Sequence, residues 1–307
     1  ANRRQDLTMR TTIVPGPQLG LDEVGIPEKH AMSLFQPFVV RQLVQQGSAR
    51  SPLDAQKLIA DKHPDTKAAL EKVMAARPVL VKRDPVLHQY GIQGHMPKLV
   101  SGDAIQLHPL HTAGYNADHD GDTMAIFVPV TADAVAEAKR MLPSQHLISA
   151  ASNKLMYVPS LEYAYGVYKL SQKGAETDKK FKTPGEILQA YHKGDLKHSD
   201  VVKLNDKATT AGRVLISTAL PEDFRHDVLH SLDKPLDVKA TGTLLTSVAK
   251  KHTADYDMYA NRLKDLGAGA ATGLVKLPLW APEKADIFDA AAAKGMSGTN
   301  VKQMATQ

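Results

Sequence analysis

Three aspartates, Asp118, Asp120 and Asp122, lie at alternate positions in one short segment of the chain. Alternate side chains of an extended segment share one face, so the three carboxylates would repel each other unless a cation neutralised them. Magnesium prefers hard oxygen ligands and shares its coordination shell with water and substrate phosphates. Gly121 allows a sharp backbone turn that lets the carboxylates converge on one ion. The segment therefore predicts a magnesium site.

The acidic segment has two other possible interpretations, a calcium loop and a solvated turn. A calcium loop of the EF-hand type needs a glycine directly after its third acidic residue and a glutamate at position twelve. Here Gly121 precedes Asp122, and position twelve is Pro129, so the pattern disfavours calcium. A solvated acidic turn without an ion is the broader alternative, which the three aspartates alone leave open.

Apolar residues on both sides of the acidic segment predict two strands that hold it as a loop. Ile105 and Leu107 precede it, whereas Met124, Ile126 and Val128 follow it. A loop mounted between two strands is a rigid support for a site.

Residues 79–130 are expected to form a compact β-rich unit. Runs of β-branched and apolar residues predict strands near 79–81 and 123–130, and residues 98–108 predict a hairpin that turns at 101–103. Residues 1–26 are expected to be extended and irregular, because prolines and glycines interrupt their apolar residues.

Helices are expected on both sides of this unit. Capping residues and apolar periodicity predict them in the first half over 28–46 with a kink or restart at Pro37, 52–61 after Ser51, 65–76, and 132–142 after Thr131. The chain beyond residue 150 is expected to be mostly helical, with a capping box at Thr183–Glu186, helices over 236–252, 254–266 and 282–294, breaks at Gly267, Gly269 and Gly273, and a short strand at 213–216.

Composition limits the class of protein. The 307 residues are 43% apolar, which is enough for a packed core and too much for a mainly disordered chain. A formal charge of +5 fits a polyanionic partner without requiring one. The chain has no cysteine, which excludes disulfides and thiolate zinc sites. No run of about 20 apolar residues suggests a membrane span, so a cytoplasmic protein with no membrane partner is expected.

Motifs along nearly the whole chain resemble those of the beta-prime family, the largest subunits of multisubunit DNA-directed RNA polymerases. The most specific match is similar to the active-site signature of that family, with His119 at a position that is usually aromatic; it comprises Ile105–Leu110, Asn116–Ala125 and Val128–Pro129. Further matches follow in the family order at the first forty residues, Lys82–His88, Gly91–Gln93, Val158–Ser160, Gly212–Val214, Arg262–Gly267 and 297–304.

The resemblance implies an α+β fold with a double-psi β-barrel catalytic core, flanking helices and a mostly helical C-terminal part. Residues 1–150 would form the barrel region, with a helical insertion at about 28–77, and residues 151–307 a funnel- or pore-like region. The acidic loop would hold catalytic Mg²⁺ on Asp118, Asp120 and Asp122, for nucleotidyl transfer from NTPs to the RNA 3′ end. By family position, Asn116 and Arg83 would detect the 2′-hydroxyl of the substrate; a turn-forming role is the alternative for Asn116.

Partners are also implied by the resemblance. They are a beta-type second-largest subunit, the remaining C-terminal part of the largest subunit with its bridge helix and trigger loop, template DNA, the RNA transcript and NTPs. The chain is much shorter than such a subunit, so we expect either a fragment or a subunit encoded in pieces, as in polymerases of some large bacteriophages. If the source is a virus, the protein would be located in the host cytoplasm. Without its partners the chain would be nearly inactive.

Other side chains near the acidic segment are open to two interpretations. Core or phosphate-contact roles are expected for four histidines, with a metal cluster as the alternative: His88, His95, His108 and His111. His119 is expected to fill the space of the family's aromatic residue. Arg3, Arg4 and Arg10 would contact nucleic-acid phosphates or face solvent. Two other functions are compatible with the whole chain: a fragment of a two-barrel RNA-silencing-type polymerase and a non-catalytic polymerase-associated structural module.

Overall fold

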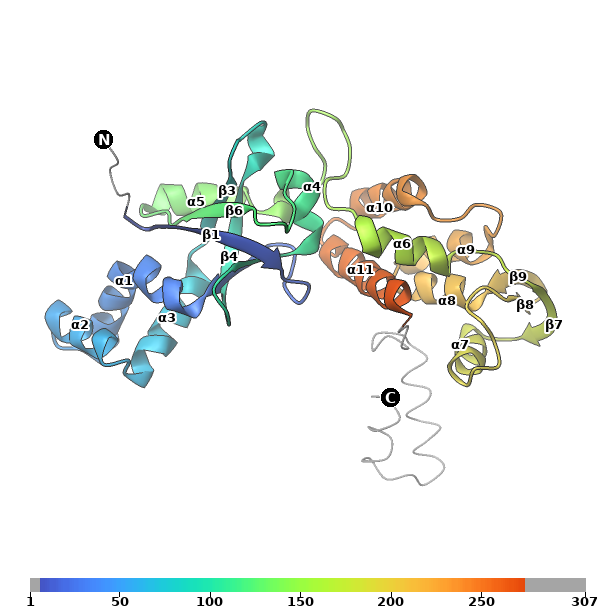
Figure 1. Ribbon diagram of the computed structural model, residues 1–307, viewed down its shortest axis with the longest axis horizontal. Helices are drawn as coiled ribbons and strands as arrows, with labels where there is room; N and C mark the ends of the chain where they lie inside the picture. Colours follow the sequence, from blue (N-terminus) through green and yellow to red (C-terminus); the bar gives the residue numbers. More distant parts are fainter. Residues whose placement is uncertain (1–5, 274–307) are drawn as a thin grey trace, which may run out of the picture. The chain divides into compact units, whose positions relative to one another are not determined.

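The computed structural model describes residues 6–273, and the chain divides into two compact units between Tyr157 and Val158 (Figure 1). The first unit contains, in chain order, β1 (Thr8–Pro15), β2 (Glu23–Pro27), α1 (Glu28–Gln45), α2 (Pro52–Ala60), α3 (Pro64–Ala76), β3 (Val79–Arg83), β4 (Ile92–Val100), β5 (Ile105–Leu107), α4 (Thr112–Tyr115), β6 (Thr123–Phe127) and α5 (Ala132–Arg140).

The six strands of the first unit close into a barrel in the order β1-β5-β2-β4-β3-β6. The pairs β1/β5 and β2/β4 are parallel, and the other pairs, including the closing pair β1/β6, are antiparallel. Closure leaves no open sheet edge within the barrel. Alternate residues of the strands are apolar and buried, as the period of two requires: Ile13, Val24, Ile26, Val79, Val81, Ile105, Leu107, Met124 and Ile126. The predicted α+β fold with a barrel core is confirmed.

Two sequence-based expectations about the strands are wrong. Residues 98–108 do not form a hairpin, because β2 lies between β4 and β5 and pairs with both. Turn residues at 101–103 indicate a reversal, but they cannot show that a strand from much earlier in the chain enters between the two arms. Within the expected irregular segment, residues 6–26 are instead largely regular, since they contain β1 and most of β2, and Pro15 and Pro27 end these strands.

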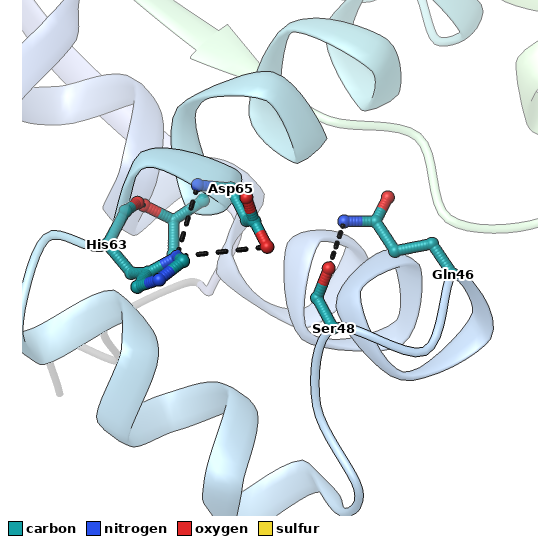
Figure 2. Close-up of polar contacts among 5 residues, drawn as sticks. Gln46, Ser48, His63 and Asp65 are labelled. Carbon is teal, nitrogen blue, oxygen red and sulfur yellow. Dashed lines mark hydrogen bonds and ion pairs between the residues drawn. The ribbon is translucent and has the colours of Figure 1, made fainter.

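Three helices lie between β2 and β3, and side chains cap the N-termini of the second and third, α2 and α3. Ser51 Oγ accepts a hydrogen bond from the backbone N–H of Asp54 at 3.2 Å, as predicted for α2. Figure 2 shows the corresponding contact at α3, where His63 Nδ1 accepts from the N–H of Asp65 at 3.3 Å. These caps satisfy N–H groups that have no partner inside the helices.

The expected restart at Pro37 does not occur, and α1 is one helix through that residue. Pro37 lies on the exposed face, where water can hydrate the carbonyl group that loses its helical partner. The opposite face of the helix supplies Leu34, Phe35, Val39 and Leu43 to the core of the first unit. Burial of that face keeps the helix continuous.

The second unit is mostly helical, as predicted. Its elements in chain order are α6 (Leu161–Leu170), β7 (Glu176–Phe181), α7 (Pro184–His192), β8 (Val201–Leu204), β9 (Lys207–Thr210), α8 (Ala211–Thr218), α9 (Glu222–His230), α10 (Val238–Lys251) and α11 (Tyr256–Thr272). Among residues 6–273, no helix is long and apolar enough to cross a membrane.

Several local expectations about the second unit need correction. The expected strand at 213–216 is part of α8, whose residues are all buried; a short apolar run does not distinguish a strand from a buried helix. A three-stranded sheet, ordered β7-β8-β9, was not predicted. Gly267 and Gly269 lie inside α11, and only Gly273 ends it, in the left-handed conformation. The helix expected at 282–294 lies outside the described residues.

A glycine is needed at position 267 inside α11 because α6 and α11 approach each other closely there. A Cβ atom on Gly267 would lie 2.1 Å from the carbonyl oxygen of Tyr163 in α6, and one on Gly166 would lie 1.7 Å from the carbonyl oxygen of Gly267. No side chain fits at either position without separating the helices. Close packing outweighs the low helix propensity of glycine in this unit.

We predict that Gly267→Ala lowers the free energy of unfolding by roughly 1–3 kcal/mol, because the added methyl group overpacks the contact between α6 and α11. Gly242→Ala is the matched control: it also lies inside a helix, and its Cβ would meet no atom within 4 Å. That change should stabilise by about 0.5–1 kcal/mol through helix propensity. Urea unfolding of both variants checks this, and equal stabilisation by both would contradict the close contact.

Candidate metal centre

The acidic loop connects α4 with β6, and its backbone turns bring the three aspartates together. Asn116 ends α4 in the left-handed conformation with φ 50° and ψ 45°, and Gly121 has φ 127°. One carboxylate oxygen from each of Asp118, Asp120 and Asp122 lies within 4.8 Å of the other two. The alternate spacing thus becomes a cluster through turns rather than through a regular strand.

Backbone hydrogen bonds fix both ends of the loop. At the entrance, the N–H of Ala117 donates to the carbonyl of Thr112 at 2.9 Å. At the exit, the carbonyl of Asp122 accepts from the N–H of Ile13 in β1 at 3.0 Å. Across the loop, the N–H of Asp118 donates to Asp122 Oδ2 at 3.1 Å. The carboxylates therefore sit on a segment whose course is set by the barrel.

Arg83, the last residue of β3, lies directly against the cluster. Its Nε atom donates to Asp122 Oδ2 at 2.8 Å, and its Nη2 atom forms an ion pair with the same oxygen at 2.8 Å; the side chains are 17% exposed for Arg83 and 22% exposed for Asp122. The guanidinium group of Arg83 offsets part of the negative charge of the loop. The structure thus brings this predicted residue together with the three aspartates.

The carboxyl groups of the cluster influence each other's protonation. Hydrogen bonding with Asp120 raises the pKa of Asp118, and the charges of Asp120 and Asp122 add to this effect. The pKa of Asp122 is lowered, first by the hydrogen bond from the backbone N–H of Asp118 and then by Arg83. Crowding of negative charge therefore acts mainly on Asp118, where a cation would relieve it.

The cluster fits a divalent cation that prefers oxygen ligands. Oxygen atoms bound to one magnesium ion lie roughly 3 to 4.2 Å apart, so the three carboxylate oxygens, which lie within 4.8 Å of one another, would move closer together to share one ion. Asp118 and Asp120 are exposed and Asp122 is half-buried, which leaves room for water and phosphate oxygens in the same shell. Within residues 6–273, no other group of three His, Asp or Glu side chains could hold an ion.

Asn116 is exposed and lies at the entrance of the loop. Its backbone N–H donates to the carbonyl of Ala113 at 3.3 Å, and its left-handed conformation is one that asparagine tolerates better than most residues. The backbone thus shows the turn-forming role that was the alternative for this residue. Contact of its amide with a sugar hydroxyl stays a prediction.

Three of the candidate histidines belong to the interior. His95, His108 and His111 are completely buried. His111 Nε2 donates to the carbonyl of Leu21 at 2.7 Å, and its ring contacts that of His95 with the centroids 4.8 Å apart. His88 and His119 are exposed. The expectation of core roles therefore holds for the three buried residues.

The candidate arginines differ in what the structure describes. Arg10 donates from Nε to Thr123 Oγ1 at 3.0 Å and lies 3.5 Å from Asp84 Oδ2, so it contacts side chains of its own barrel. Arg3 and Arg4 lie outside the described residues. Tyr115, which directly precedes Asn116 and is 3% exposed, was not singled out from the sequence, because nothing local distinguishes it from any core aromatic residue.

Comparisons with known proteins agree with this geometry. The family described as RNA polymerase Rpb1, domain 2, matches residues 2–143, which include the barrel and the acidic loop. A DNA-directed RNA polymerase subunit beta′ from Sulfurihydrogenibium sp. is 36% identical over 279 residues, which cover 88% of this chain and 17% of the relative. The chain is a beta-prime-type RNA polymerase region. The subunits beta′ of Campylobacter fetus (37% identical, 88% of this chain, 19% of the relative) and Saccharopolyspora erythraea (34%, 95% and 24%) extend the similarity beyond the barrel. This beta-prime-type region thus spans about a fifth of the length of these curated relatives.

We predict that the beta-prime-type region loses stability as the pH falls below about 6.5, because His95 and His111 are buried as neutral rings. Burial lowers the pKa of His95 from 6.5 to about 3 and lowers that of His111 well below 6.5. Below pH 6.5 the unfolded chain binds protons that the folded chain does not. Each histidine therefore lowers the free energy of unfolding by up to roughly 1.4 kcal/mol for each pH unit that the pH falls. Urea unfolding between pH 6.5 and 5 measures this slope.

The controls for this slope are two single substitutions. His95→Phe should remove the contribution of one buried histidine from the slope of the free energy of unfolding against pH. His192→Gln, at an exposed position, should leave that slope unchanged. A free energy of unfolding that does not change between pH 6.5 and 5 would contradict the buried neutral rings.

Proposed function

We propose that this region carries the catalytic magnesium of a DNA-directed RNA polymerase and takes part in nucleotidyl transfer from NTPs to the RNA 3′ end. The observation that supports this most is the convergence of Asp118, Asp120 and Asp122 on one point of a loop fixed to a closed barrel. The curated relatives are named as subunits of a DNA-directed RNA polymerase, which favours transcription from DNA over an RNA-silencing-type polymerase.

In this proposal the residues of the chain have distinct tasks. Bound magnesium would supply the positive charge that lowers the pKa of the RNA 3′-hydroxyl and neutralises the reacting phosphate. Asp118 and Asp120 would offer exposed oxygens toward incoming groups, and Asp122, fixed by Arg83, would hold the other side of the shell. Arg83 and Asn116 flank the cluster, from where a guanidinium and an amide could contact a sugar hydroxyl.

The proposed reaction needs parts that this chain does not supply. We propose as partners a beta-type second-largest subunit, the bridge helix and trigger loop of the largest subunit, template DNA and the RNA transcript. The chain by itself would be nearly inactive, and the reaction would take place in the cytoplasm, of the host if the source is a bacteriophage. A split phage subunit remains a prediction, since the matched relatives are bacterial.

The proposal is tested by Mg²⁺-dependent extension of an RNA primer on a DNA template, using the native complex that co-purifies with this chain. Asp120→Ala should reduce the extension rate by more than about 100-fold, because even the loss of groups that only orient metal ligands costs 10- to 100-fold. Asp178→Ala, which removes an exposed aspartate of β7 in the second unit, is the matched control and should extend at the normal rate.

Assembly of both variants is checked by size-exclusion chromatography. Normal extension by an intact complex with Asp120→Ala would contradict the proposal and favour the non-catalytic structural module instead.

A further inference from the structure

A hydrogen bond buried beneath the acidic loop joins His95 in the barrel wall with Tyr115 at the loop entrance. His95 Nε2 lies 2.9 Å from the hydroxyl of Tyr115. We propose that His95 is a positioning residue for the metal centre: it holds the Tyr115 hydroxyl, fixes the start of the acidic loop and thereby raises the affinity of the three aspartates for a divalent cation. The inference rests on the proposed function, because it assumes that the loop binds such a cation.

The hydrogen-bond partners determine the protonation of the pair. The Tyr115 hydroxyl donates to the carbonyl of Val81 in β3 at 3.4 Å, and a carbonyl oxygen can only accept. The hydroxyl must therefore accept from His95 Nε2, which carries a proton. Burial raises the pKa of Tyr115 well above its ordinary value, so the phenol stays intact as a donor. His95 is thus a neutral ring whose one N–H points at Tyr115.

This arrangement anchors Tyr115 to two neighbouring strands. His95 lies in β4 directly opposite Val79 of β3, and Val81 lies two residues further along β3. His95 is 0% exposed and Tyr115 is 3% exposed, so water cannot replace either partner. A lost donor at His95 would leave the hydroxyl without its second hydrogen bond in the core.

The anchor acts on the loop because α4 is too short to hold its own position. It has four residues, one helical turn, which is not stable without tertiary contacts. Tyr115 is its last residue, Asn116 turns the chain in the left-handed conformation, and Asp118 follows two residues later. At the other end of α4, His111 directly precedes the helix and donates to the carbonyl of Leu21. Both ends of α4 are therefore held by histidine contacts, and the end nearer the aspartates depends on His95.

A purely structural role for His95 would be met by any ring of similar volume. Phenylalanine fills space in a core without the cost of burying polar nitrogen atoms, and His95 Nδ1 has no hydrogen-bond partner among the described residues. The polar ring therefore introduces an unsatisfied atom that an apolar ring would avoid. Its one satisfied contact is the hydrogen bond to Tyr115, which is the feature that a phenylalanine would lack.

The test measures Mn²⁺ binding to the full chain by electron paramagnetic resonance, with the thermal midpoint of each variant recorded in parallel. His95→Phe should raise the Kd for Mn²⁺ about tenfold, the equivalent of one lost hydrogen bond. His95→Gln, which restores a side-chain N–H donor, should recover part of the affinity. Tyr115→Phe removes only the hydroxyl and should raise the Kd to a similar extent, so it serves if His95→Phe does not fold.

Two controls make the outcome specific. Leu34→Ala in α1 opens the core of the same unit away from this hydrogen bond, so it should lower the thermal midpoint without changing the Kd. The double change His95→Phe with Tyr115→Phe should weaken binding no more than either single change, because both remove the same contact. A normal Kd in both single variants, or a Kd that only follows the thermal midpoint, would overturn the positioning role.

Asp120→Ala separates this inference from the proposed function. If Asp120→Ala abolishes Mn²⁺ binding while His95→Phe and Tyr115→Phe bind normally, only the positioning role fails. If Asp120→Ala binds Mn²⁺ as tightly as the unmodified chain, the metal centre itself is wrong, and the positioning role falls with it.

Discussion

Repulsion among three carboxylates within 4.8 Å of one another is the constraint that the rest of the first unit must offset. Such crowding is unfavourable in an exposed loop unless neighbouring groups offset the charge. The chain does this on one side only, where Arg83 and the N–H of Asp118 both donate to Asp122. Asp118 and Asp120 remain exposed, so the negative charge that is left faces solvent.

The barrel makes this arrangement durable because the loop cannot relax by moving away. The loop exit is bound to β1 through Ile13, and Arg83 extends from the end of β3. Beneath the entrance, Tyr115 is tied to β3 and β4 through Val81 and His95. Strands that are distant in the sequence thus hold one short loop from several sides. A closed core of alternating apolar residues keeps the supports of the loop in register.

The features that could be predicted from the sequence are those that depend on residues close together in the chain. The acidic cluster, its flanking strands, and the caps at Ser51 and Thr131 all depend on short spacings, and the structure contains each of them. Pairing of β2 between β4 and β5 could not be predicted, because parallel partners are chosen by closure of the barrel. The contact of Arg83 with Asp122 and the anchor at Tyr115 also join residues far apart in the chain, so local patterns carry no signal for them.

Mn²⁺ anomalous scattering is the most direct test of whether the acidic loop of this chain holds one divalent cation on three aspartates. Crystals of the complex that contains this chain would be soaked in Mn²⁺ at a concentration that supports RNA extension. We expect an anomalous peak within roughly 2–2.5 Å of oxygens from Asp118, Asp120 and Asp122. A peak held by other residues, with none at the acidic loop, would contradict it.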